Sequence, residues 1–185
     1  LVLFTSDNGP WLIFDDHGGS AGLLREGKGS TWDGGMREPT IAWWPGTVAA
    51  GSVCAEVAGT LDLLATAASL SGGELPTDRT LDSHDLSPLL RGSGQFTREA
   101  FYYYRGVRLF AVRRGPWKAH FLTQSGYGQA KPEEHDPPLL FNLEIDPSEQ
   151  WNVAAKNPEV IAELKRLAEE HSAGVKAVPS QLELR

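Results

Sequence analysis

The sequence predicts an α/β region over residues 1–95, followed by a smaller α+β subdomain over residues 96–185 in which a helix covers an antiparallel sheet. Two observations support this division. An apolar run at residues 1–5 stops at a carboxylate, an amide and a glycine, which is typical of a strand that ends at the ligand-binding edge of an α/β sheet. Several aromatic and β-branched runs then follow closely in the second half, before one amphipathic helix.

The first part alternates predicted strands and loops with one helix. Residues 1–4 are all apolar, which predicts a buried parallel strand over residues 1–5 whose neighbours come from elsewhere. We therefore expect the sequence to be the carboxyl-terminal part of a longer protein. A second buried strand is predicted at 39–44. A helix is predicted at 61–70, with Thr60 as its N-cap and Gly72 at its end.

The second half follows a linker at 83–94 that ends in glycine and serine. Apolar and aromatic residues there predict strands at 100–104, 107–113, 117–123 and 139–143. Asn157 and Pro158 stand in the order of an N-cap and a first-turn proline, which predicts the start of the last helix. We expect the apolar stripe of that helix to pack on the small sheet; it consists of Val160, Ile161, Leu164, Leu167 and Ala168.

Composition excludes several functional classes. The net charge is −7 and no cluster of Lys and Arg occurs, which argues against nucleic-acid partners and against an anionic membrane surface. No apolar stretch approaches the roughly 20 residues that span a bilayer. A single cysteine, Cys54, rules out an internal disulfide framework. Because Cys54 has no basic or histidine neighbour in the sequence, we expect a small buried side chain there and not a nucleophile.

A Gly-rich stretch at 9–37 is long for a structureless segment, and such segments are usually functional. It follows Asp7 and Asn8, whose oxygen atoms suit Ca²⁺ or Mg²⁺. It also contains Lys28 between two glycines, where an anion can approach the ammonium closely. An Asp-Asn-Gly turn and a solvated surface lysine explain the same residues without any site. His120 lies in a predicted strand, where a half-exposed histidine is the default and a substrate-facing one is the alternative.

Taken together and in order, the motifs of the chain closely resemble the type I, formylglycine-dependent sulfatase family. Within that family, the motifs look like those of the arylsulfatase A and N-acetylgalactosamine-6-sulfatase groups. The resemblance implies that residues 1–95 are the end of an alkaline-phosphatase-like sulfatase domain and residues 96–185 its small carboxyl-terminal subdomain. The matching segments cover nearly the whole chain: 4–10, 18–29, 34–39, 44–46, 61–64, 85–90, 110–113, 118–121 and 146–152.

The resemblance also implies roles for individual residues. Asp7 and Asn8 match a pair that binds the catalytic Ca²⁺, with Mg²⁺ as the alternative ion, and Lys28 matches a lysine that contacts the substrate sulfate. His120 matches a histidine near the substrate pocket, so Lys28 and His120 are the expected catalytic and substrate-binding residues. The family completes its metal site with two more aspartates, and its formylglycine nucleophile comes from a C/S-x-P-x-R motif. Neither is in this sequence, and Cys54 does not fit that motif.

The function that the resemblance implies is hydrolysis of aryl or sugar sulfates, with a sulfated small molecule or glycan as substrate. We expect the rest of the sulfatase chain to be required and the 185-residue chain alone to be inactive. The resemblance further implies a periplasmic, secreted or lysosomal location, and leaves homo-oligomer formation open. Two alternatives remain at this point. One is a phosphodiesterase or phosphonate hydrolase of the same superfamily, and the other is a non-catalytic sugar- or partner-binding relative.

Overall fold

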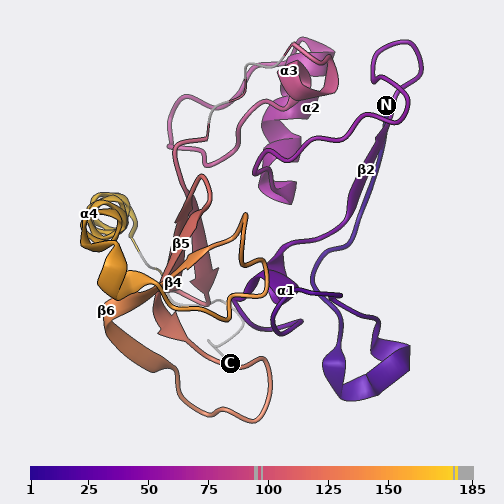
Figure 1. The fold of residues 1–185 in the computed structure, drawn as a ribbon. Coiled ribbons are helices and arrows are strands. Elements are labelled where there is room, and N and C mark those ends of the chain that lie inside the picture. The colour runs from indigo at the N-terminus through magenta and orange to yellow at the C-terminus, as the bar shows by residue number, and fades with distance from the viewer. Residues whose placement is uncertain (94–95, 97, 177, 179–185) are drawn as a thin grey trace. The chain divides into compact units, whose positions relative to one another are not determined.

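A computed structural model describes residues 1–93, 96, 98–176 and 178 of the chain (Figure 1). The chain forms two compact units, each built from two separate segments. The first unit combines Leu1–Asp7 with Pro39–Glu99, and the second combines Asn8–Glu38 with Ala100–Arg185. Within this chain the Gly-rich segment therefore packs with the carboxyl-terminal half. The predicted domain boundary at residue 95 concerns the whole protein and stays a prediction.

In the first unit, β1 (Val2–Thr5) pairs with β2 (Thr40–Trp43). The two strands are antiparallel. The strand at 1–5 was predicted to be parallel with neighbours from elsewhere, whereas this neighbour is antiparallel and comes from within the chain. The prediction that both strands are buried is wrong, because Phe4 is 66% exposed and Ile41 is 62% exposed. The physical reason is that the described residues place no further strand beside this two-stranded sheet. Apolar composition predicted the strands correctly but not their surroundings.

The helical part of the first unit consists of η2 (Thr60–Asp62), α2 (Leu63–Ser71) and α3 (Ser87–Leu90). The predicted helix is present and ends at Gly72, which adopts the left-handed conformation. Asp62, and not Thr60, is its N-cap residue, and its buried carboxylate accepts the backbone N–H groups of Gly59 and His84. The predicted linker contains α3, and its last residue lies outside the described residues. Cys54 is exposed, which corrects the prediction of a buried thiol.

The second unit contains a four-stranded antiparallel sheet in the sequential order β3-β4-β5-β6 (Figure 1). The strands are β3 (Phe101–Arg105), β4 (Arg108–Arg114), β5 (Trp117–Thr123) and β6 (Glu133–Asn142). Each overlaps a strand predicted from the sequence. The tight connection between β4 and β5 depends on Gly115, whose φ of +54° is readily available to glycine.

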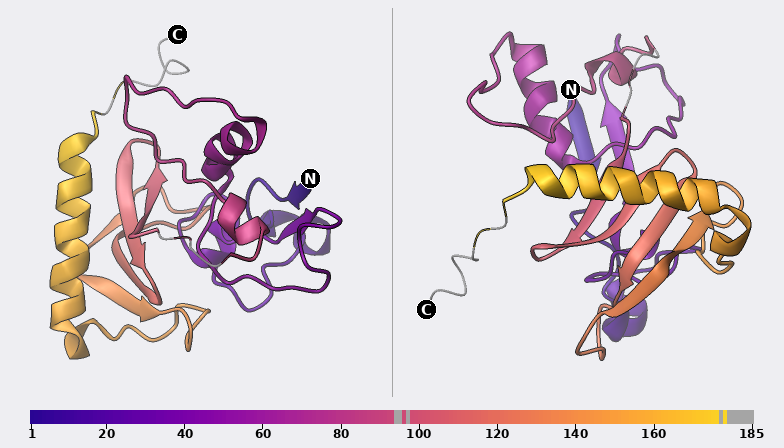
Figure 2. Two further views of the ribbon diagram at one scale, coloured as in Figure 1. Left: turned by 90° about the horizontal axis from the view of Figure 1, so that it is seen from above. Right: turned by 90° about the vertical axis from the view of Figure 1, so that its left-hand side faces the viewer.

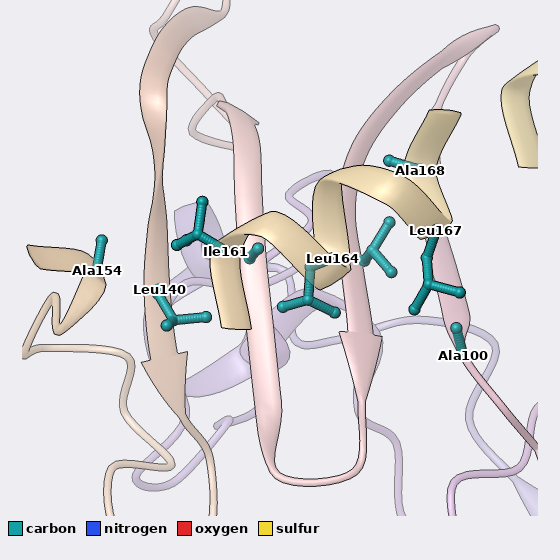
Figure 3. Close-up of a cluster of buried hydrophobic side chains, with 9 residues drawn as sticks. Ala100, Leu140, Ala154, Ile161, Leu164, Leu167 and Ala168 are labelled. Atoms are coloured by element: carbon teal, nitrogen blue, oxygen red, sulfur yellow. The ribbon is translucent and has the colours of Figure 1, made fainter. Parts of the chain in front are cut away.

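Helix α4 (Pro158–Gly174) lies along one face of this sheet (Figure 2). The predicted stripe is confirmed, since its residues join small and branched strand residues in a buried cluster. Figure 3 shows this cluster, which consists of Ala100, Val112, Ala119, Leu140, Ala154, Ile161, Leu164, Leu167 and Ala168. Asn157 occupies the N-cap position, but its side-chain amide donates to the carbonyl of Val153 instead of capping the helix.

The segment Asn8–Glu38 of the same unit contains η1 (Leu12–Gly18) and α1 (Asp33–Met36), and its residues 31–33 contact the opposite face of the sheet. Here Trp32 packs against Phe141 of β6 and against Leu143, which directly follows β6. A short η3 (Ala154–Lys156) precedes α4. Among the described residues, none of the helices has the length and apolar character needed to cross a bilayer.

Candidate functional site

Asp7 and Asn8 lie at a bend directly after β1, as predicted. The Asp7 side chain is exposed and Asn8 is half-buried. The next residue, Gly9, donates its N–H to the carbonyl of Gly35 at 3.3 Å. A Cβ atom on Gly9 would stand 2.0 Å from the carbonyl oxygen of Gly34, so only glycine fits. Gly9 is therefore held against the α1 region by a contact between backbones.

Lys28 lies half-buried in the Gly-rich segment. Its backbone N–H donates to the carbonyl of Pro10 at 2.9 Å, and its ammonium lies 5.1 Å from the ring centroid of Trp11. On another side, a Cβ on Gly126 would come within 2.4 Å of the Lys28 carbonyl oxygen. Backbone from two distant parts of the sequence thus packs closely around Lys28. The structure brings the segment after Asn8 next to this lysine within one unit.

The metal assignment depends on Asp7 and Asn8, which belong to different units. Their carboxylate and amide oxygens are the hard ligands that Ca²⁺ and Mg²⁺ prefer, so the donor chemistry fits. Two side chains are too few for the six to eight oxygens of a typical Ca²⁺ site. The described residues contain no group of three or more His, Cys, Asp and Glu arranged to hold a metal ion. Further ligands must therefore come from elsewhere if an ion binds here.

His120 differs most from its sequence-based prediction. It is fully buried, so the expectation of a half-exposed strand histidine is wrong. Its ring centroid lies 4.2 Å from that of Trp32, and its Nε2 lies 2.7 Å from the Oε1 of Glu149. Burial, which outweighs the opposing effect of the Glu149 hydrogen bond, lowers the His120 pKa to about 4. The imidazole is thus neutral at pH 7, and we assign its Nε2–H as the donor to Glu149.

The structure also contains a buried cation that sequence reasoning missed. Lys118 is fully buried, and its ammonium lies 2.7 Å from Asp33 Oδ1 and 3.1 Å from Glu149 Oε1. It also donates to the carbonyl of Thr31 at 2.9 Å. Burial pushes the Lys118 pKa down, but attraction to Glu149 and Asp33 outweighs this effect and leaves the pKa raised. Lys118 is therefore charged.

Glu149 connects the members of this group. Its Oε2 accepts the backbone N–H of Asp33 at 2.7 Å, while its Oε1 faces Lys118 and His120. Burial raises the Glu149 pKa, yet the Lys118 charge and the His120 hydrogen bond prevail and lower the pKa to about 2. The only sequence signal for this group was the alternation that places Lys118 and His120 on one strand face. The partners Asp33 and Glu149 carried no local signal.

We name Asp33, Lys118, His120 and Glu149 the ionic cluster. With no exposed surface on Lys118, His120 or Glu149 and 1% on Asp33, it is not placed to bind a solute directly. Lys28, by contrast, is a single half-buried cation among glycines. Lys28, and not the ionic cluster, therefore has the exposure that direct contact with a solute requires.

Comparison with known proteins identifies the family. The sulfatase family model matches residues 1–73, and the model for the C-terminal region of aryl-sulfatase matches residues 97–185. Arylsulfatase A of Homo sapiens is 46% identical over 189 residues, an alignment that covers 90% of this chain and 36% of that protein. N-acetylgalactosamine-6-sulfatase of Mus musculus is 39% identical over 208 residues, which cover all of this chain and 39% of that protein.

Solved structures agree. The crystal structure of PsFucS1 sulfatase from Pseudoalteromonas sp. superimposes with a TM-score of 0.84 at 29% identity, covering 96% of this chain and 37% of that chain. The chain thus spans a little over a third of the length of these relatives. The predicted family and fold class are confirmed. The chain belongs to the sulfatase family and resembles the carboxyl-terminal part of its members.

Proposed function

We propose that the protein to which this chain belongs hydrolyses sulfate esters, with an aryl or sugar sulfate as substrate. The observation that carries the proposal is the backbone contact between Lys28 and Pro10, which brings the anion-binding candidate next to the segment of the metal-binding candidate Asn8. The names of the relatives, arylsulfatase A and N-acetylgalactosamine-6-sulfatase, support the same substrate class. The partner is thus a sulfated small molecule or glycan.

Lys28 would bind the sulfate group. Its ammonium is a compact charge on a flexible stem, and the flanking Gly27 lets the backbone that carries it pack closely against Pro10, where a Cβ would come within 2.5 Å of the carbonyl oxygen. Cleavage of a sulfate ester moves negative charge onto the sulfuryl and leaving oxygens, so a cation held in place before the reaction favours the transition state. The Trp11 ring, whose centroid lies 5.1 Å from the ammonium, is within range of a cation–π interaction that would help to hold the Lys28 side chain in place.

Asp7 and Asn8 would hold a divalent ion, Ca²⁺ in the first place and Mg²⁺ as the alternative. When bound, such an ion supplies positive charge that polarises a sulfate oxygen and favours the deprotonated nucleophile. In this proposal the remaining aspartate ligands and the formylglycine nucleophile lie outside the sequence described here. The 185-residue chain alone is then expected to hydrolyse no sulfate ester.

The predicted contact of His120 with substrate is less well supported. For such a contact the imidazole would have to leave Glu149 and Trp32, with which it is fully buried. We propose instead that His120 acts indirectly, by orienting the Glu149 carboxylate. A neutral imidazole suits this role because it donates one hydrogen bond without adding a second buried cation.

Steady-state kinetics of the full-length protein on an aryl sulfate test the proposal. Lys28→Ala should raise KM and lower kcat together, by about 10²–10³ in kcat/KM, because the ammonium contacts the sulfate in both the ground and the transition state. Lys28→Arg should not restore activity, since the planar guanidinium is larger. Lys131→Ala, at an exposed lysine, is the matched control. An unchanged kcat/KM for Lys28→Ala would refute the role of Lys28.

The same assay separates the alternative functions. A phosphate diester and a phosphonate ester, each offered as a substrate beside the aryl sulfate, test for a phosphodiesterase or a phosphonate hydrolase of the same superfamily. Turnover of those esters, with none of the sulfate, would replace the proposed substrate. Sugar binding without hydrolysis of any of the three would instead indicate a non-catalytic relative.

Asp7→Ala should abolish metal-dependent turnover, and near-wild-type activity would remove Asp7 from the metal site.

A further inference from the structure

The ionic cluster joins two parts of the sequence that are far apart. Asp33 belongs to the Gly-rich segment, while Lys118 comes from β5 and Glu149 follows β6. The carboxylate of Glu149 accepts the Asp33 N–H at 2.7 Å, although the two residues are 116 positions apart. From the sheet side, Lys118 donates to the carbonyl of Thr31 at 2.9 Å. The backbone at 31–33 is thus held by both a cation and an anion.

Short-range contacts connect this backbone to Lys28. The N–H and the hydroxyl of Ser30 both donate to the carbonyl of Gly27, at 3.2 and 3.0 Å, which closes a tight turn around Lys28. The N–H of Gly34 donates to the carbonyl of Arg25 at 2.8 Å, which joins the two ends of residues 25–34. We call these residues the Lys28 loop. A shift of the backbone at 31–33 would therefore move the turn that carries Lys28.

A second tether reaches the same loop. Arg25 donates to the backbone carbonyl of Glu149 at 2.8 Å, and its guanidinium lies 3.8 Å from the ring centroid of Trp32. Glu149 is held at a φ of +50°, a conformation that L side chains rarely adopt. Such backbone strain persists where surrounding contacts fix it, and it is common at functional sites. Both the side chain and the backbone of Glu149 thus hold the Lys28 loop.

We infer that Glu149 is a positioning residue for Lys28, acting through its bond to the Asp33 N–H. The inference rests on the proposed anion-binding role of Lys28. A buried ion pair adds little to the stability of a fold, because the free energy lost when the two charges leave water offsets much of their attraction. It does fix geometry, and small displacements of a catalytic group have large effects on rate. The ionic cluster therefore acts on the reaction without touching the substrate.

The test measures competitive inhibition by inorganic sulfate in the full-length protein, with an aryl sulfate as substrate. This inhibition constant does not depend on how much of the enzyme is folded. Glu149→Ala removes the acceptor for the Asp33 N–H and should raise the constant about tenfold or more. Glu149→Gln keeps an acceptor oxygen and should restore most of the affinity. Arg25→Met keeps the packing on Trp32 but loses one tether, and should give a smaller shift in the same direction.

The controls distinguish the possible failures. Leu164→Ala weakens the core on the other sheet face and should leave the inhibition constant unchanged. In a Lys28→Ala background, Glu149→Ala should have no further effect. If Lys28→Ala itself leaves sulfate inhibition unchanged, the proposed function fails. If Lys28→Ala weakens inhibition but neither Glu149→Ala nor Arg25→Met does, only the positioning role is overturned, and it is also overturned if the effect of Glu149→Ala persists without Lys28.

Discussion

The two faces of the four-stranded sheet are buried by different means. On the α4 face, residues such as Ala119 and Leu140 pack against Leu164 in an apolar cluster. On the opposite face the neighbouring β5 residues Lys118 and His120 are just as buried, but they contact charged and aromatic groups. Apolar packing is non-directional and adjusts to changes of shape. The ionic cluster needs every partner in place. We therefore expect substitutions to be tolerated on the α4 face of the sheet and to be strongly destabilising on the opposite face.

The largest expected effect is loss of the buried cation. Lys118→Met should lower the free energy of unfolding by about 3–5 kcal/mol, because it leaves the carboxylates of Asp33 and Glu149 buried without their counter-charge. Denaturant unfolding of the full-length protein measures it. Adding Asp33→Asn and Glu149→Gln to Lys118→Met should recover much of the loss, since no buried charge then remains. A loss below about 1 kcal/mol for the single variant would contradict the expected sensitivity of this face to substitution.

A cavity on the apolar face should have a somewhat smaller effect. Leu164 is 1% exposed, and Leu164→Ala should cost roughly 3 kcal/mol through lost burial and incomplete collapse around the missing atoms. Leu164→Met, which conserves volume, should cost less than about 1.5 kcal/mol. The same denaturant titration checks both. If Leu164→Met proved as damaging as Leu164→Ala, the tolerance claimed for this face would be wrong.

The two faces should also differ in their response to pH. The folded His120 pKa of about 4 lies below the ordinary 6.5, so between these values the unfolded chain binds more protons and stability falls as the pH falls. The loss from pH 7 to pH 4 should be on the order of 2–3 kcal/mol. His120→Gln should flatten this part of the pH profile of thermal unfolding. His17→Gln, at an exposed histidine, should leave it unchanged, and an identical profile for both variants would refute the assignment.

The smallest effect is expected at the rim of the apolar face. Arg114 and Glu163 form an ion pair there, with side chains 40% and 44% exposed. Because solvent and salt screen exposed charges, Glu163→Gln should change stability by only about 0.2–1 kcal/mol. Repeating the unfolding titration at high salt should remove even this difference. A change comparable to that of Lys118→Met would show that exposure does not separate the two kinds of ion pair.

Sequence reasoning predicted the apolar face well and the ionic face poorly. The stripe of α4 and the strands beneath it follow local periods of apolar residues, which are visible without knowledge of the fold. The ionic cluster depends on contacts between residues such as Asp33 and Lys118, 85 positions apart, which no local pattern encodes. No local feature of the sequence therefore marked Lys118 as a buried cation. The roles of Asp7, Asn8 and Lys28 came from family resemblance and remain predictions.

The division of the second unit into two separate segments has a consequence for biosynthesis. Glu149 is made about 110 residues after Glu38, the end of the segment that carries Lys28. At about 5–20 residues per second, the segment waits roughly 5 to 20 seconds on the ribosome before its docking surface exists. During that interval Glu149 is not there to accept the N–H of Asp33, and the backbone at 31–33 lacks this contact. The Lys28 loop is thus one of the last parts of this chain to be ordered, and it is accessible to chaperones and proteases until then.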